Sequence, residues 1–155
     1  MAVGHDRETN DGKWFKEQMK ELEKLEVRVG YQQGENTDKE TGADLADIAM
    51  WNEYGTEYVP PRPFLRQSVD NYASQISAMC KAQLQAIASK RSTAEQALNA
   101  LGNMQRGLVQ DEILDGEFVP NAPATVRNKK SDTPLIDTGN MRQKVNFVIV
   151  PKGRD

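Results

Sequence analysis

Two consecutive amphipathic runs between residues 64 and 115 constrain the fold of this 155-residue chain more than any other feature. Apolar residues recur at three- and four-residue steps through residues 64–90, which predicts one long helix. A capping-box pattern at residues 92–95 predicts the start of a second helix, and Gly116 follows its expected end near Asp115. More than 50 residues in a row are therefore expected to be almost entirely helical.

Two glycines lie inside the second of these helices, at Gly102 and Gly107. Each costs about 1 kcal/mol relative to alanine in a helix interior. We expect them to mark a bend or a close contact with another element.

The remaining elements are shorter. Helical periodicity predicts helices over residues 13–25 and 43–54, and alternation of apolar residues predicts strands over 27–31 and 144–150. Because a two-stranded ribbon is marginal alone, the strands are expected to share a small antiparallel sheet packed against the long helices. Short strands at 57–60 or 117–119 would complete it. The predicted fold class is α+β.

Polar segments separate and flank these elements. Residues 1–12 are expected to form a flexible arm, residues 13–150 a single α+β domain, and residues 151–155 a polar tail. Residues 32–42 contain no apolar residue and are rich in glycine, asparagine and acidic residues, which predicts a long exposed hairpin loop or a disordered excursion. Its neighbourhood holds four carboxylates that lack EF-hand spacing, so they are interpreted as solvated rather than as a cation site: Asp38, Glu40, Asp44 and Asp47.

Composition excludes several classes of protein. Hydrophobic residues make up 37% of the chain and mean hydropathy is −0.72, so the core is expected to be modest and completed by a partner. No apolar run approaches the roughly 20 residues of a membrane-spanning helix, and residues 1–7 lack the apolar core of a signal peptide. Cys80 is the only cysteine and His5 the only histidine, which argues against zinc clusters and a Ser/His/Asp triad. We expect no cofactor, no metal and no enzymatic activity.

Charge is distributed unevenly along the chain. Residues 1–124 hold 13 Lys and Arg against 20 Asp and Glu, a net charge of −7, whereas residues 125–155 hold 7 against 3, a net charge of +4. A basic end can bind nucleic acid, and we keep this as an alternative that uses residues 127–130 and 142–154. The low overall pI of 5.3 and the absence of interleaved aromatic residues argue against it.

Asp137, Thr138 and Gly139 match the active-site tripeptide of aspartic proteases. That chemistry needs two carboxylates that share a proton. Only 16 residues follow Gly139, too few for the rest of such a domain. A hydrolase built around Asp137 is therefore a weaker hypothesis than a helix cap or turn before the last strand.

A proline-stiffened aromatic segment offers the clearest candidate for binding. Aromatic residues and arginine are enriched at interface hot spots, although the same side chains can also pack as core, and both readings can hold for different residues. The candidate interface residues are Trp51, Tyr54, Tyr58, Val59, Arg62 and Phe64, and the candidate turn residues are Pro60, Pro61, Pro63, Asp137 and Gly139.

Two sequence blocks resemble those of a known group of proteins. The first comprises residues 47–56 (DIAMWNEYGT) and 59–65 (VPPRPFL). The second comprises Thr125, Lys129 or Lys130, and residues 134–142 (PLIDTGNMR). Together they resemble the tail-completion and neck (minor tail) proteins of tailed bacteriophages, similar to lambda protein Z and Mu protein G.

This resemblance implies a non-enzymatic virion component at the head–tail joint, assembled in the cytoplasm of the host bacterium. Such proteins form a homo-oligomeric ring, usually six-fold, that completes the tail and joins it to the head. The implied partners are further copies of the chain and other neck and tail proteins, namely the connector or stopper and the tail terminator or tube. DNA would at most pass through the lumen of the ring.

Overall fold

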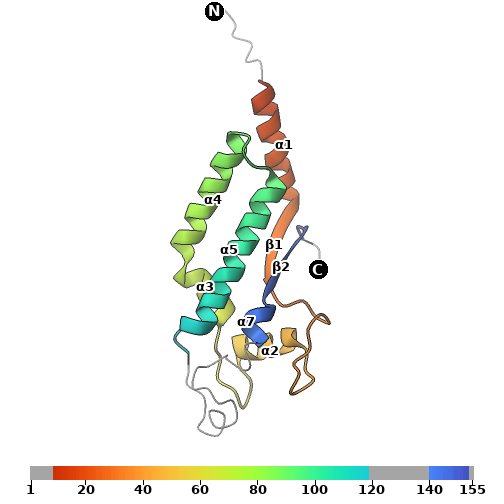
Figure 1. Cartoon of the computed structure of the whole chain (residues 1–155), viewed down its shortest axis with the longest axis vertical. Coiled ribbons are helices and arrows are strands. Elements are labelled where there is room, and N and C mark those ends of the chain that lie inside the picture. The colour runs from red at the N-terminus through yellow and green to blue at the C-terminus, as the bar shows by residue number, and fades with distance from the viewer. Residues whose placement is uncertain (1–8, 119–139, 154–155) are drawn as a thin grey trace, which may run out of the picture.

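The computed structural model describes residues 9–118 and 140–153. The elements in chain order are α1 (Asn10–Lys24), β1 (Leu25–Gly30), α2 (Leu45–Tyr54), α3 (Phe64–Asn71), α4 (Ala73–Ala88), α5 (Ala94–Asp115), α7 (Asn140–Lys144) and β2 (Asn146–Pro151). Three helices, α1, α4 and α5, run along the long axis of the molecule, and α2, α3 and α7 lie towards one end (Figure 1). The fold is α+β, as the sequence predicts.

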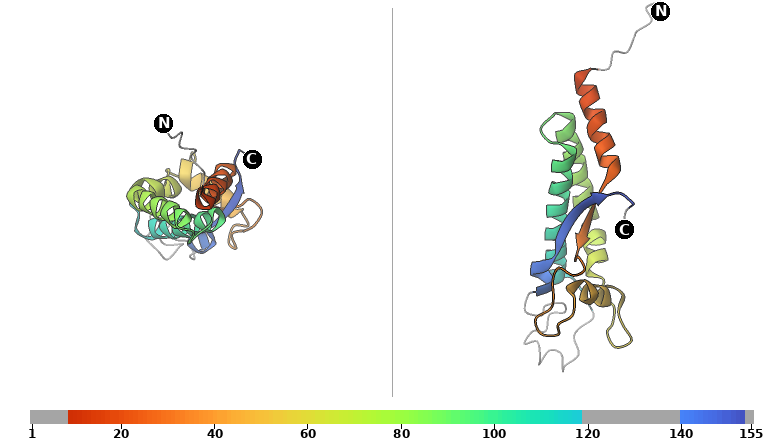
Figure 2. Two further views of the ribbon diagram at one scale, coloured as in Figure 1. Left: turned by 90° about the horizontal axis from the view of Figure 1, so that it is seen from above. Right: turned by 90° about the vertical axis from the view of Figure 1, so that its right-hand side faces the viewer.

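The strands β1 and β2 form a two-stranded antiparallel sheet, although they lie at opposite ends of the sequence. Leu25 pairs with Pro151 and Gly30 with Asn146, so all six residues of each strand are matched. The sheet runs beside α5 and twists across the molecule (Figure 2). The predicted additional strands at 57–60 and at the described residues 117–118 do not form.

Helix α5 is the centre of the structure, because α1, α3, α4, α7 and both strands pack against it. Its cap is a capping box formed by Thr93 and Gln96, one residue later than the sequence pattern indicated. A cluster of buried hydrophobic side chains lies around the last turns of α5, at the end of the molecule where α2, α3 and α7 meet. It contains Leu45, Ala49, Phe64, Val109, Ile113, Met141 and Val145.

The predicted continuous helix over residues 64–90 is interrupted at Tyr72, whose φ of −116° and ψ of 20° separate α3 from α4. The residues just before the break bind α5. The hydroxyl of fully buried Ser68 accepts a hydrogen bond from Gln105 at 3.2 Å, and the amide of Asn71 donates to Glu112 at 3.0 Å. These tertiary contacts hold α3 against α5, and the apolar periodicity that continues through the break gives no sign of them.

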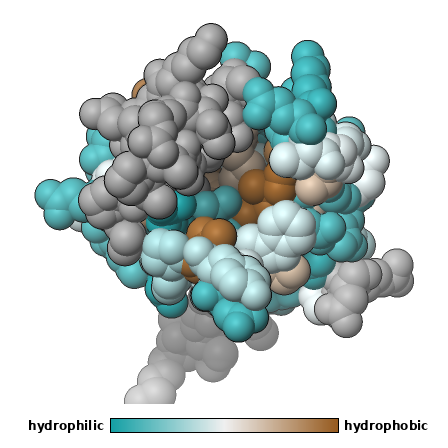
Figure 3. Space-filling model, turned by 90° about the horizontal axis from the view of Figure 1, so that it is seen from below, coloured by the Kyte–Doolittle hydropathy of each residue, from teal (hydrophilic) through white to brown (hydrophobic). Residues whose placement is uncertain are grey.

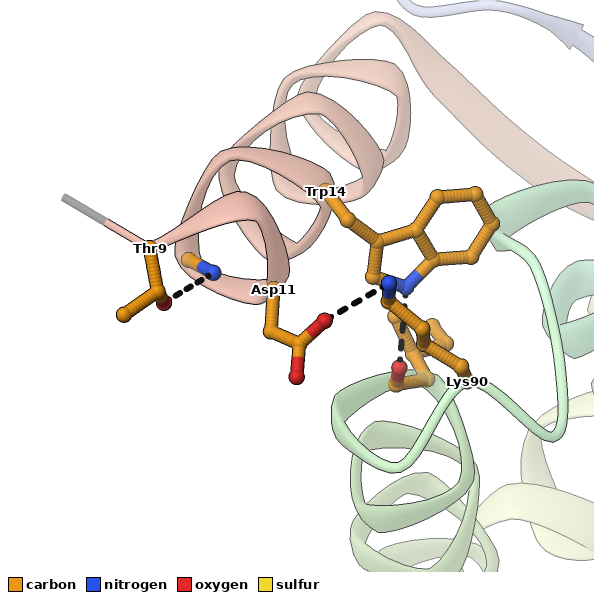
Figure 4. A network of polar contacts seen from close by, with 6 residues as sticks. Thr9, Asp11, Trp14 and Lys90 are labelled. Carbon is orange, nitrogen blue, oxygen red and sulfur yellow. Dashed lines mark hydrogen bonds and ion pairs between the residues drawn. The ribbon is translucent and has the colours of Figure 1, made fainter.

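Helix α1 begins at Asn10, so the predicted flexible arm over residues 1–12 is wrong for its last residues. The hydroxyl of Thr9 accepts a hydrogen bond from the Gly12 N–H at 3.0 Å and caps the helix. The first two turns of α1 are also tied to the end of α4, where Trp14 donates to the Ile87 carbonyl at 3.2 Å (Figure 4). Lys90 completes this contact with an ion pair to Asp11 at 2.6 Å.

The strand boundaries also differ slightly from those predicted. β1 starts at Leu25, immediately after α1, and β2 extends to Pro151, the first residue of the predicted polar tail. The Lys152 N–H continues the ladder by donating to the Lys24 carbonyl at 2.8 Å. Among the described residues, no helix is long and apolar enough to cross a membrane.

Candidate interaction surface

Helix α2 has one face buried in the core and one face exposed to solvent. Its cap is Asp44, whose carboxylate accepts hydrogen bonds from the Ala46 N–H at 3.0 Å and from the Gly34 N–H at 2.6 Å. Leu45 and Ala49 enter the core. The opposite side of the helix therefore presents its side chains to solvent.

The loop after α2 is held by a tight set of backbone contacts. Gly55 has a φ of 76°, and a Cβ atom there would lie 2.9 Å from the Pro61 nitrogen and from the Val59 carbonyl oxygen. Glycine is required on both grounds. Thr56 closes the turn, because its N–H donates to the Val59 carbonyl at 2.8 Å and its hydroxyl accepts from the N–H groups of Tyr58 and Val59.

Two further contacts fix this loop to its flanking helices. The Arg62 N–H donates to the Asn52 carbonyl at 2.5 Å. The carboxylate of Glu53 accepts hydrogen bonds from the Leu65 and Arg66 N–H groups, each at 3.0 Å. Pro63, at the N-cap position of α3, provides no side-chain cap, so Glu53 of the preceding helix satisfies the free N–H groups of α3 instead.

Four large side chains are exposed on this framework. Tyr58 is 86% exposed, Tyr54 77%, Met50 51% and Trp51 44%. We call these four residues the aromatic surface. They belong to α2 and its loop, at the end of the molecule that Figure 3 shows from below, where weakly polar and hydrophobic side chains are exposed between polar ones. Met50 was not among the predicted interface residues, although its position beside Trp51 could have indicated it.

The six predicted interface residues therefore divide into two groups. Trp51, Tyr54 and Tyr58 are exposed and Val59 is half-buried. Phe64 is fully buried, with its ring edge-on to Tyr31 at a centroid distance of 6.2 Å, and Arg62 is only 8% exposed. The prediction of an interface role is wrong for these last two as free surface residues, because their side chains belong to the interior.

The predicted turn residues are only partly described. Pro60 and Pro61 are exposed and Pro63 is half-buried next to α3. Asp137 and Gly139 lie outside the described residues, as does the basic cluster at 127–130.

Burial lowers the pKa of Arg62, whose ordinary value is so high that the guanidinium keeps its charge.

Asp38 has a structural role in the loop that the sequence interpretation did not assign to it. It is only 7% exposed, and its carboxylate accepts hydrogen bonds from the Thr41 hydroxyl at 2.6 Å and the Thr41 N–H at 2.9 Å. Asn140 of α7 approaches the second oxygen at 3.5 Å. The expectation of a solvated loop carboxylate is wrong at this position, and Asp38 instead joins the loop to α7. The hydrogen bond from Thr41 lowers its pKa.

Two open clefts lie away from the aromatic surface. One, of about 470 Å³, lies beside the start of β2 and is lined mainly by polar residues such as Glu35, Arg106 and Lys144. The other, of about 480 Å³, is bordered by α1 and the start of α5 and contains Thr93. The Thr93 hydroxyl is engaged as a helix cap. Among the described residues, no three His, Cys, Asp or Glu side chains are grouped as they would be to hold a metal ion.

Comparison of the chain with protein-family models, with curated proteins and with solved structures gave no match.

Proposed function

We propose that this protein is a structural component of a bacteriophage neck, a tail-completion protein that forms a ring at the top of the tail and joins it to the head. The aromatic surface would contact a neighbouring subunit or neck protein. The single observation that carries the proposal is the way this surface is displayed: large exposed side chains on a backbone that is fixed before any partner arrives.

The physical argument concerns conformational entropy. Tyrosine and tryptophan bury a large area for few rotatable bonds, and a preformed backbone removes the cost of ordering a loop on binding. Tyr54 and Tyr58 stand on a helix and a turn that Gly55, Thr56 and Glu53 hold in place. Such a surface is suited to shape-specific contact within an assembly.

The sequence block that resembles phage neck proteins supports this view when its residues are assigned to parts of the structure. Glu53 and Gly55 build the framework, through the cap of α3 and the turn. Arg62 joins the framework through its N–H, and Phe64 anchors it in the core. The exposed aromatic residues lie between them.

The proposal is tested in virus particles. A premature stop codon in this gene should give separate heads and tails in negative-stain images, and the wild-type gene supplied in trans should restore joined particles. Normally joined particles without the protein, or mature virions that do not contain it, would overturn the proposal.

Variants locate the contact. Tyr54→Ser combined with Tyr58→Ser should fail to restore joining while the purified protein keeps its circular dichroism spectrum and melting temperature. Leu84→Ser on α4, at a side chain that is 44% exposed, is the matched control and should restore joining. If both variants restored joined particles equally well, the aromatic surface would not be a contact that joining requires.

A further inference from the structure

The two strands of the sheet have free edges, and their register shows which backbone groups point outwards. The Lys152 N–H donates to the Lys24 carbonyl, and these residues lie opposite one another when the register is continued by one position. Antiparallel pairs alternate between hydrogen-bonded and non-hydrogen-bonded types. It follows that the backbone groups of Val148 and Val150 bind β1, whereas those of Phe147 and Ile149 point away from it.

The outer edge of β2 is protected at its last residue, where Pro151 has no N–H to offer a further strand, but not along the residues before it. Residues 147–150 read Phe-Val-Ile-Val, without a charge, proline or glycine. The outward N–H of Phe147 is bound at 2.9 Å by the side chain of its neighbour Asn146. Within the described residues, neither strand pairs with a third, which leaves the Ile149 N–H and the Phe147 and Ile149 carbonyls available for another strand.

The sheet is also apolar on both faces along β2. Phe147 and Ile149 face α5, on the same side as Val27 and Val29 of β1. Val148 and Val150 lie on the opposite face and are only half-buried. An added strand would extend both faces and cover more of these side chains.

We propose that the outer edge of β2 pairs with the outer edge of β1 of a second copy of this chain, so that the two-stranded sheets of successive copies join into one antiparallel sheet. The strands then alternate in direction across each boundary, and every copy has the same orientation. This is a heterologous, head-to-tail contact, which closes into a ring when the rotation allows it. The inference deepens the proposed function and rests on it for the ring.

Charge favours β1 as the occupant through the segments that flank the strands. The strands themselves are neutral, because Glu26 and Arg28 of β1 form an ion pair and β2 carries no charge. With their flanking residues, however, the segment 21–35 carries four carboxylates and two cations, a net charge of −2, and the segment 142–152 carries three cations and no carboxylate, a net charge of +3. Pairing β1 with β2 brings opposite charges together. Pairing two β2 strands in a symmetric dimer would instead bring two flanking segments of +3 together, and this repulsion between like charges opposes the pairing.

Hydrogen exchange of the full-length protein tests the pairing residue by residue. As the chain self-associates at rising concentration, the amides of Ile149, Val27 and Val29 should slow by at least about an order of magnitude, while those of Val148 and Val150 should be slow in both states. Protection of Ile149 without Val27 and Val29 would indicate a β2–β2 dimer and overturn the choice of occupant. An oligomer with a fast Ile149 amide, or a chain that stays monomeric up to millimolar concentration, would overturn the edge pairing.

A proline substitution tests the same bond chemically. Ile149→Pro removes the outward N–H without touching the ladder to β1, so mass measurement in solution should find only monomer, whereas Ile149→Val keeps the N–H and should still associate. Circular dichroism reports whether Ile149→Pro folds, and if it does not, the exchange pattern of the wild type decides. All these measurements use the purified chain, so a negative result leaves the neck function to be judged separately from the virion experiments.

Discussion

The ring of Phe147 on β2 lies against the backbone of Gly102 on α5, so closely that a Cβ atom at residue 102 would overlap the ring. Arg106, one turn further along α5, covers the ring with its guanidinium 5.7 Å from the ring centroid. Gly102 is therefore the point at which the sheet docks on the central helix, one of the two roles expected for it from the sequence. Gly107 has open space around its Cα and shows no such contact.

This difference predicts opposite effects for the same substitution at two positions of one helix. Gly107→Ala should stabilise the protein by about 0.5–1 kcal/mol, because alanine is the better helix former and its methyl group meets nothing. Gly102→Ala gains the same propensity, but overlap with Phe147 forces the sheet to shift, which costs about 1–3 kcal/mol. Urea unfolding of both variants measures the free energies. Stabilisation by Gly102→Ala would contradict the docking described here.

Lys90 gives a second prediction, because it is the only described residue other than glycine with a positive φ, at 59°. It occupies the left-handed position of a Schellman motif, in which the Arg91 N–H donates to the Ala86 carbonyl at 2.8 Å and the Lys90 N–H to the Ile87 carbonyl at 3.0 Å. An L-residue pays about 1–2 kcal/mol for this conformation. The ion pair of Lys90 with Asp11 is exposed on both sides, and such pairs contribute only about 0–1 kcal/mol.

Lys90→Gly should therefore raise the free energy of unfolding by about 0.5–1 kcal/mol, once the greater entropy of glycine in the unfolded chain is included. Lys90→Ala is the control, since it loses the ion pair and keeps the strained backbone, and it should be slightly destabilising. Thermal melts at two salt concentrations separate the two effects. If Lys90→Ala were as stable as Lys90→Gly, the backbone conformation would not be the deciding factor.

Local patterns carried most of the information that could be obtained from the sequence. The alternation of β1 and β2, the capping box of α5 to within one residue, and the stop at Gly116 are all decided by residues within a few positions, and the α+β class follows from them. The break at Tyr72 could not be predicted, because it depends on contacts of Ser68 and Asn71 with α5, about 40 residues away.

The candidate site shows the same limit. An arginine among prolines and aromatic residues is normally exposed, yet Arg62 is buried where the loop returns to the core. Phe64 and Tyr58 look alike in the sequence, and only the three-dimensional path of the loop places one inside and the other outside. Asp38 illustrates both sides of this limit: Thr41, only three residues further on, could have indicated the turn, whereas Asn140 is 102 residues away and approaches Asp38 only in the folded chain.

Asp38 predicts a specific dependence of stability on pH. Hydrogen bonds from Thr41 lower its pKa in the folded protein below the value of about 3.9 typical of unfolded aspartate. Its contribution to stability is thus fully present above the unfolded pKa and is lost as the pH falls through the folded pKa. Asp38→Asn should destabilise the protein by about 1–3 kcal/mol at neutral pH.

The difference between wild type and Asp38→Asn should then shrink as the pH falls below about 4. Urea unfolding at a series of pH values measures it, and Asp70→Asn, at an exposed position of α3, serves as the control with little effect at neutral pH. A stability difference that stays constant across this range would mean that the charge of Asp38 does not contribute.

The division of the proline-rich segment into core and surface gives the last prediction. Phe64 is fully buried between α5, α2 and the ring of Tyr31, so Phe64→Ala removes a core side chain and should cost about 3–5 kcal/mol. Tyr58 is 86% exposed, so Tyr58→Ala should change the free energy of unfolding by no more than about 0.5 kcal/mol. Assembly into particles should fail with both variants, but for different reasons: too little folded protein in the first case and a missing contact in the second. Unfolding measurements on the purified variants separate these causes, and a Tyr58→Ala protein that is destabilised as strongly as Phe64→Ala would place Tyr58 in the interior instead.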